Sequence, residues 1–263
     1  MKHFLSAVAL LCAASSTSAA EQSVFNGEWV LDLSSAQLSN KPFTVTVKDG
    51  QFTCDSCVPS YTIPADGAFH PVARQTSLDE ASVTIIDPRT MRMVERLRGR
   101  VVHDETDVAS PDGATLTYTV VIGGATSGKT TKETGVQVRT GTADPAAHLT
   151  SGAWRTTTIA DPSAEKTRFT ITVNGNVMSQ RNSTGQSFAA TIGGGFVPIS
   201  GTDIPGEVSV TRDGPRTLIE TFRRQGQIGI VRTLTVLADG KTLAISNDNK
   251  LLGSVDRLTA HKS

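Results

Sequence analysis

His70 is the strongest candidate for chemistry in this chain. At the matching position of a sequence repeat, described below, the chain has Val197, so folding does not require an imidazole there. An imidazole can act as a general base or a metal ligand near neutral pH. The alternative is a surface or partly packed histidine, and the sequence leaves both interpretations open.

A glutamate with large apolar neighbours occurs in each half of the chain, in strands expected over 91–97 and 216–223. The neighbours two residues away are Met93 and Leu97 for Glu95, and Leu218 and Phe222 for Glu220. The 125-residue offset suggests equivalent positions. A carboxylate facing an apolar interior is costly unless it is paired or protonated. We therefore expect polar anchors inside a ligand cavity, with a raised pKa or an arginine partner such as Arg98 or Arg232. The alternative is that both glutamates lie on an outer barrel face.

Cys54 and Cys57 are the only cysteines left once an N-terminal export segment, which contains Cys12, is removed. Two such cysteines in an oxidising compartment usually form a disulfide. A redox-active pair would normally open a helix, but the flanking residues read as a strand and a proline turn. A metal site using both thiolates with His70 and His103 is a weaker alternative, so we expect a disulfide and no metal.

Residues 123–130, Gly-Gly-Ala-Thr-Ser-Gly-Lys-Thr, match the phosphate-binding loop pattern letter for letter. That loop depends on a following helix that directs its N-terminus at the phosphates. Residues 131–138 instead alternate and are rich in β-branched side chains, so we expect a hairpin turn and no nucleotide. The common hydrolase motifs, Gly-x-Ser-x-Gly and His-Glu-x-x-His, are absent from the sequence.

These residues belong to a chain that contains a tandem duplication. Four segments recur in the same order at offsets of 125 to 127 residues: 27–29 with 152–154, 43–47 with 169–173, 67–72 with 194–199, and 112–116 with 239–243. The repeat predicts two units, 21–142 and 152–263, joined by a linker over 143–151.

Each unit consists of short alternating segments separated by turns such as Pro-Asp-Gly and Ala-Asp-Gly, with no sustained helical periodicity. Eight or nine strands per unit are enough to close an antiparallel barrel, which can enclose one small ligand. We therefore predict an all-β protein of two tandem antiparallel barrels; two β-sandwiches are the alternative.

Several short motifs resemble those of exported bacterial lipocalin-like proteins. They are Gly-x-Trp at 27–29, Ala-Asp-Gly followed by Phe-His-Pro-Val at 65–72, a Val-Ser-Val strand at 208–210, and Asp-Gly-Lys-Thr-Leu at 239–243. The resemblance covers nearly the whole chain after residue 20, in two copies. It implies barrels of the lipocalin type, but no particular activity and no catalytic residues.

The first twenty residues have the features of a signal peptide. A short basic start precedes an apolar run over 4–14, which is too short to span a membrane, and Ser18 and Ala20 suit a signal peptidase. We expect cleavage after Ala20 and a periplasmic or secreted protein without a membrane span. The 25 basic and 25 acidic residues balance, which argues against a nucleic-acid partner.

The leading functional hypothesis is a non-enzymatic exported protein that binds a small apolar or amphipathic ligand in a barrel, without a cofactor. The candidate ligand-binding residues are Trp29, Tyr61, His70, Glu95, Trp154 and Glu220. For the two tryptophans, packing at the barrel base is the main alternative. A second hypothesis is a hydrolase or isomerase that uses His70 and Glu95 as catalytic residues in the first unit. A third is an interaction module whose barrels are filled by side chains.

Overall fold

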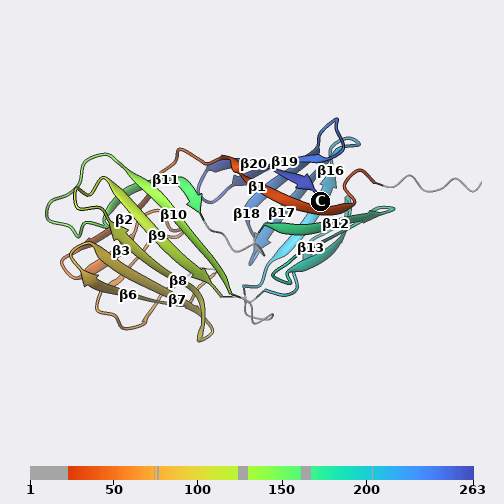
Figure 1. The fold of residues 1–263 in the computed structure, drawn as a ribbon. Helices are drawn as coiled ribbons and strands as arrows, with labels where there is room; N and C mark the ends of the chain where they lie inside the picture. The colour runs from red at the N-terminus through yellow and green to blue at the C-terminus, as the bar shows by residue number, and fades with distance from the viewer. Residues whose placement is uncertain (1–22, 74, 76, 124–129, 161–166, 203) are drawn as a thin grey trace, which may run out of the picture.

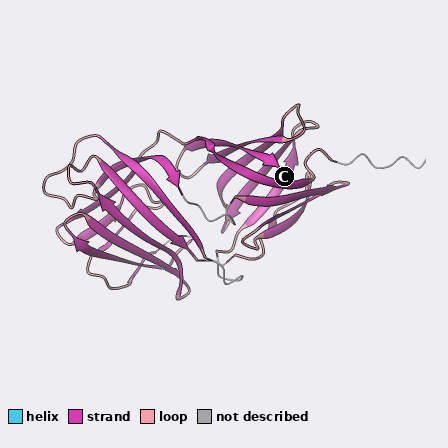
Figure 2. Cartoon of the chain, in the orientation of Figure 1, coloured by secondary structure: helices cyan, strands magenta, loops and turns pink. Residues whose placement is uncertain are grey.

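The computed structural model describes residues 23–263 except 74, 76, 124–129, 161–166 and 203. Strands β1 to β20, and no helix, are found in this part of the chain. They form two antiparallel sheets of ten strands, each curled into a nearly closed barrel (Figures 1 and 2). The prediction of an all-β protein with two tandem antiparallel barrels is confirmed.

Barrel 1 contains most of the first unit. In order around the sheet, its strands are β4 (Tyr61–Pro64), β3 (Gln51–Cys54), β2 (Phe43–Lys48), β11 (Gly152–Ala160), β10 (Thr131–Thr140), β9 (Thr115–Ile122), β8 (Arg100–Ala109), β7 (Thr90–Leu97), β6 (Glu80–Asp87) and β5 (His70–Pro71). The two ends of the sheet meet where the Gly67 N–H donates to the Val83 carbonyl at 2.9 Å.

Barrel 2 contains most of the second unit. Its strands, in order, are β14 (Ser187–Thr191), β13 (Val177–Asn182), β12 (Arg168–Asn174), β1 (Gly27–Gln37), β20 (Ser254–Lys262), β19 (Thr242–Asn249), β18 (Gln227–Val236), β17 (Thr217–Arg224), β16 (Glu207–Arg212) and β15 (Val197–Pro198). Its ends meet through reciprocal backbone hydrogen bonds between Ser187 and Ser200, at 3.0 and 2.9 Å.

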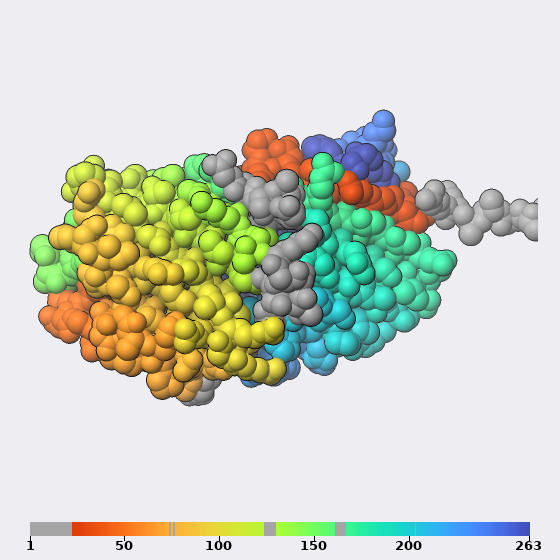
Figure 3. All heavy atoms as spheres, turned by 60° about the horizontal axis from the view of Figure 1, so that its bottom comes forward, coloured from red at the N-terminus to blue at the C-terminus, as the bar shows by residue number. Residues whose placement is uncertain are grey.

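The two units exchange their first strands. Strand β1 of the first unit lies between β12 and β20 in barrel 2, where Figure 1 shows it in red among teal and blue strands. The space-filling view in Figure 3 likewise shows red atoms beside teal and blue ones. Strand β11 of the second unit lies between β2 and β10 in barrel 1. Each barrel therefore differs from a sequence unit by one strand. Both exchanged strands begin with Gly-x-Trp, so each barrel receives a tryptophan from the other unit.

The base of each barrel is closed by the tryptophan of the exchanged strand. The Trp29 indole N–H donates to the Phe25 carbonyl at 2.9 Å, and Trp154 donates to Thr150 at 2.8 Å. Both tryptophans are buried. A cation covers each ring: the Lys262 ammonium lies 5.0 Å from the ring centre of Trp29, and the Arg139 guanidinium lies 4.2 Å from that of Trp154.

The glycine of each Gly-x-Trp motif makes room for that cation. Gly152 has a φ of +138°, and a Cβ there would lie 2.3 Å from Nη1 of Arg139. Gly27 has a φ of +142°, and its Cβ would lie 3.1 Å from Cε of Lys262. Glycine is favoured at both positions because it accepts this backbone conformation and leaves the space empty.

The residues after β10, predicted to be a linker over 143–151, pack against barrel 1. The His148 N–H donates to the Val47 carbonyl at 2.9 Å, and the Arg139 guanidinium donates to the Leu149 carbonyl at 2.8 Å. Thr150 and Ser151 are buried. This stretch is held to barrel 1 by hydrogen bonds at several points.

The hairpin predicted in place of a phosphate-binding loop is borne out by its flanks. Ile122 at the end of β9 pairs with Thr131 at the start of β10, and the residues that follow form a strand. Residues 124–129 themselves lie outside the described part of the chain.

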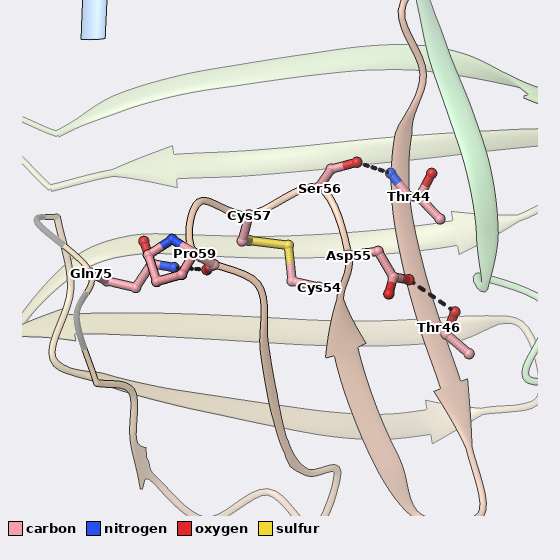
Figure 4. Close-up of a disulfide and its surroundings, with 8 residues drawn as sticks. All are labelled: Thr44, Thr46, Cys54, Asp55, Ser56, Cys57, Pro59 and Gln75. Carbon is pink, nitrogen blue, oxygen red and sulfur yellow. Dashed lines mark hydrogen bonds between the residues drawn. A yellow bond between two sulfur atoms is a disulfide. The ribbon is translucent and has the colours of Figure 1, made fainter. Parts of the chain in front are cut away.

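Cys54 and Cys57 form the expected disulfide (Figure 4). It closes the short loop after β3, where Ser56 Oγ accepts a hydrogen bond from the Thr44 N–H at 2.9 Å. A disulfide is compatible with a protein outside the cytoplasm. The described residues include no helix suited to crossing a membrane. The predicted signal peptide, residues 1–20, lies outside the described residues.

Candidate functional site

The strand register defines which residues of the two barrels are equivalent. Leu97 pairs with Arg100 across the β7–β8 turn, and Arg224 pairs with Gln227 across the β17–β18 turn, so these hairpins match at an offset of 127. Glu95 is therefore equivalent to Phe222, and Glu220 to Met93. The expectation that the two glutamates are equivalent is wrong, because it relied on a 125-residue offset that the hairpin register does not follow.

Barrel 2 contains a cavity of about 380 Å³ at the end where the β17–β18 turn lies. One part of its wall is apolar and consists of Phe188, Ile199, Ile204, Phe222, Ile230 and Leu251. The other part is polar and includes three arginines, Arg223, Arg224 and Arg232. No aspartate or glutamate is among the described residues that line it. Its size lies within the range of small-molecule sites.

An ion pair connects the wall of this cavity to the buried interior of barrel 2. Arg232 Nη1 is 3.4 Å from Glu220 Oε2, and Arg232 Nε donates to Asn247 Oδ1 at 2.8 Å. Glu220 is fully buried, and its Oε1 has no hydrogen-bond partner in the described structure. Burial raises the pKa of Glu220, and the guanidinium of Arg232 opposes that rise. The predicted pairing of an interior glutamate with Arg232 is thus confirmed.

Two other polar groups at the cavity can interact with a ligand. The side-chain oxygen of Gln180 is buried and, within the described residues, has no hydrogen-bond donor. Arg224 lies at the exposed rim, and its side chain forms no hydrogen bond or ion pair with any other described residue. Arg223, by contrast, donates to Glu207 at 2.8 Å and lies over the ring of Phe196.

The same end of barrel 1 holds a cluster of acidic groups around a histidine. Glu95 on β7 pairs in register with His103 on β8, and His103 Nε2 is 2.8 Å from Glu105 Oε2. Burial raises the pKa of Glu95, against the opposing effect of His103. Burial lowers the pKa of His103, but the carboxylates of Glu105 and Glu95 outweigh it, so the net shift is upward.

Asp107 extends this cluster toward the middle of barrel 1. It is 9% exposed, and its Oδ1 has no hydrogen-bond partner in the described structure. Burial raises the pKa of Asp107 well above its usual value, and the neighbouring Glu105 adds to the rise. On the adjacent strands, the Tyr118 hydroxyl donates to Glu133 Oε1 at 2.8 Å, and burial raises the pKa of Tyr118.

His70 lies apart from this cluster. Its Nε2 is 2.8 Å from Asp66 Oδ1, and the Asp66 side chain is half exposed. His70 and Glu95 each pair with Ala81, from opposite sides, so their backbones are separated by two strand spacings, or about 10 Å. The structure therefore places the two candidate catalytic residues with different partners: Asp66 for His70, and His103 for Glu95.

The other predicted site residues are also accounted for. Arg98 lies at the exposed β7–β8 turn, where its backbone N–H donates to Asp79 at 2.7 Å, rather than beside Glu95. Tyr61 lies in barrel 1; burial raises its pKa, and the Glu95 carboxylate adds to the rise. None of the residues expected to bind a ligand lines the cavity of barrel 2. Glu220 is linked to it through Arg232.

The cavity of barrel 2 and the cluster of barrel 1 occupy equivalent places. From the hairpin registers, the matched pairs are Gln180 with Cys54, Phe188 with Tyr61, Phe222 with Glu95, Ile230 with His103, and Arg232 with Glu105.

Sequence reasoning missed Glu105 and Asp107. The signal was present, because residues 103, 105 and 107 alternate along one strand and must share a face.

The described residues contain no group of three His, Cys, Asp or Glu side chains arranged to hold a metal ion. A scan against protein-family models, a search of curated proteins and a search of solved structures each find no match to this chain.

Proposed function

We propose that this protein binds a small amphipathic molecule with an anionic head group in the cavity of barrel 2. The observation that carries the proposal is the division of that cavity into an apolar wall and a polar wall with three arginines. Glu207 and Glu220 pair with Arg223 and Arg232, so the excess positive charge of this wall comes from Arg224. Such a wall favours a negative charge on the ligand, while the apolar wall favours a hydrocarbon portion.

The polar wall suggests how the head group lies. Arg232 is partly engaged by Glu220 and Asn247, but a guanidinium has five N–H donors, so it can also bind a carboxylate. Arg224 has no partner within the described residues and lies at the rim, where it can attract the same charge. Gln180 Oε1 can accept a hydrogen bond from a hydroxyl group of the ligand.

Two further observations favour binding over catalysis. A nearly closed antiparallel barrel can hold one small ligand inside it, as the resemblance to exported lipocalin-like proteins also implies. The hydrolase alternative required His70 and Glu95 to act together, whereas His70 is hydrogen-bonded to Asp66 and Glu95 lies beside His103.

Calorimetric titration of the purified protein with decanoate and with decanol tests this proposal. The two probes have the same chain length and differ in charge. We expect decanoate to bind with one site per chain. Ile230→Trp, which fills the cavity, should abolish binding. The double variant Glu220→Gln/Arg232→Gln removes the guanidinium without leaving its buried partner charged. It should weaken decanoate binding by about tenfold or more and change decanol binding much less.

The matched control is Glu105→Gln, which changes the position in barrel 1 that is equivalent to Arg232 and should leave decanoate binding intact. The proposed site is wrong if decanoate binds Ile230→Trp as well as it binds the wild type. The proposed head-group class is wrong if the double variant loses affinity for decanol and decanoate equally.

A further inference from the structure

We propose that the open end of barrel 1 is a second binding site, selective for a small organic cation with a primary ammonium group. The ammonium binds Glu105 and Asp107, and Glu95 adds negative charge beside Glu105. This site is separate from the cavity of barrel 2, and the two proposals can fail independently.

The position of the three carboxyl groups supports this assignment. Glu105 and Asp107 are two residues apart on β8 and share its inner face, and Glu95 lies on the neighbouring strand β7, beside His103. Glu95 and Glu105 occupy the places that Phe222 and Arg232 occupy around the cavity of barrel 2. Residues at this level of the barrel are therefore placed to face a ligand, and here they present negative charge.

The cluster has more acceptors than donors. Three carboxyl groups share two donors: the His103 imidazole, which lies 2.8 Å from Glu105, and the Tyr61 hydroxyl beside Glu95. Asp107 is 9% exposed and its Oδ1 accepts no hydrogen bond from any described residue. A buried carboxylate oxygen without a donor is costly, so an unmatched acceptor at this depth points to a donor that a ligand supplies. An ammonium group offers three N–H donors and no acceptor, which is the complement of this cluster.

The surroundings favour an organic ammonium over a metal ion. Met93 lies on β7 two residues from Glu95, and Tyr61 lies on β4 of the same barrel; both pack at the edge of its apolar core and provide aromatic and apolar surface for a cation with a hydrocarbon chain. The side chains of His103 and Glu105 are 25% and 21% exposed, so water and a small solute can reach the cluster from the open end.

Protons and the cation compete for this site. Burial raises the pKa of Glu95 and, more strongly, that of Asp107, so without a cation these groups retain protons. The other titratable groups facing them are Tyr61, His103, Glu105, Tyr118 and Glu133. An ammonium ion displaces protons from the carboxyl groups as it binds. Affinity therefore rises with pH, and binding releases protons to the buffer.

Calorimetric titration of the whole protein with butylammonium, and with butyrate as the probe of opposite charge, tests the proposal. We expect saturable binding of butylammonium that strengthens from pH 5.5 to pH 7.5. Asp107→Asn should weaken binding by about tenfold, because it removes a charge-assisted hydrogen bond. Glu95→Gln should weaken it less, because it removes a neighbouring negative charge and no hydrogen bond to the ammonium. Glu95→Gln is the second variant in case Asp107→Asn does not fold.

The matched control is Ile230→Trp, which blocks the cavity of barrel 2 and should leave butylammonium binding unchanged. Loss of binding in that variant would place the ammonium in barrel 2 and overturn the assignment. The assignment is also wrong if butylammonium shows no saturable binding, if butyrate binds equally well, or if zinc binds and butylammonium does not.

Discussion

The two barrels share a base and differ at the open end. Each base has a strand that begins with Gly-x-Trp. The buried indole N–H donates a hydrogen bond to the carbonyl four residues earlier, and a cation covers the ring. At the open ends, barrel 2 has an apolar cavity with arginines, whereas barrel 1 has Glu95, His103 and Glu105 in the equivalent places. The two units thus share the residues that close the barrel and differ in the charge of the residues at the open end.

The strand exchange also means that the base and the open end of one barrel come from different units. Because β1 belongs to barrel 2 and β11 to barrel 1, the base of each barrel is completed by the other unit. The open end of each barrel, in contrast, is made by β7–β8 or β17–β18 of one unit. A substitution of a base tryptophan should therefore affect the barrel opposite to its sequence unit, and a substitution at the open end should affect its own.

The largest effect is expected from removing a base tryptophan. Trp29→Ala should destabilise barrel 2 by about 3–5 kcal/mol, because it leaves a large cavity in a close-packed core. Hydrogen exchange measured by mass spectrometry should become faster in β12 and β20, the neighbours of β1.

The reciprocal variant is Trp154→Ala, which should speed exchange in β2 and β10 of barrel 1. If Trp29→Ala instead speeds exchange in β2 and β10, β1 lies in the barrel of its own unit and the exchange is absent in solution.

A smaller difference is expected between the two cations at the bases. The Arg139 guanidinium donates to the carbonyls of Gly113, Ser151 and Leu149, whereas the Lys262 ammonium donates only to that of Val24 among the described residues, at 3.2 Å. Arg139→Met leaves three carbonyls without a donor and should cost about 2–3 kcal/mol, against about 1 kcal/mol or less for Lys262→Met. Urea unfolding of both variants measures this difference, and equal losses would show that covering the indole is the main role of either cation.

Much of this fold could be predicted from the sequence because it depends on local patterns. Alternating strands and turns predicted the barrels, and the β-branched residues after position 130 predicted a hairpin rather than a phosphate-binding loop. The pairing of Glu220 with Arg232 was also correct. In each case the residues that decide the outcome lie close together in the sequence or on adjacent strands.

The strand exchange and the barrel 1 cluster could not be predicted in the same way. Strands β1 and β11 both begin with Gly-x-Trp, so neither pattern shows which barrel each one joins. The cluster depends on register: β8 carries an irregularity between the pairs Glu95–His103 and Arg96–Val101, and only the paired strands show which residues face one another. Counting residues between glutamates gave the wrong equivalence for this reason.

A gain of stability, rather than a loss, is expected at Asp107, whose equivalent in barrel 2 is Leu234. Asp107→Leu replaces a buried carboxyl group with the apolar residue of the other barrel and should stabilise the protein at pH 7.5 by about 1–3 kcal/mol, the cost of burying an unsatisfied polar group. Because burial raises the native pKa of Asp107 above 3.8, the native state retains a proton that the unfolded state has released. This group therefore lowers stability as pH rises above about 4, up to its native pKa.

The stabilisation by Asp107→Leu should accordingly be smallest near pH 4 and grow toward pH 7.5, as urea unfolding at both values can measure. Asp107→Asn is the control for size, because it keeps the shape and removes only the titration. If Asp107→Leu stabilises the protein equally at both pH values, Asp107 is ionised in the native state and barrel 1 already supplies a counter-charge. A loss of stability at both values would mean that the Asp107 carboxyl accepts hydrogen bonds in solution, and that the cluster is held together without a ligand.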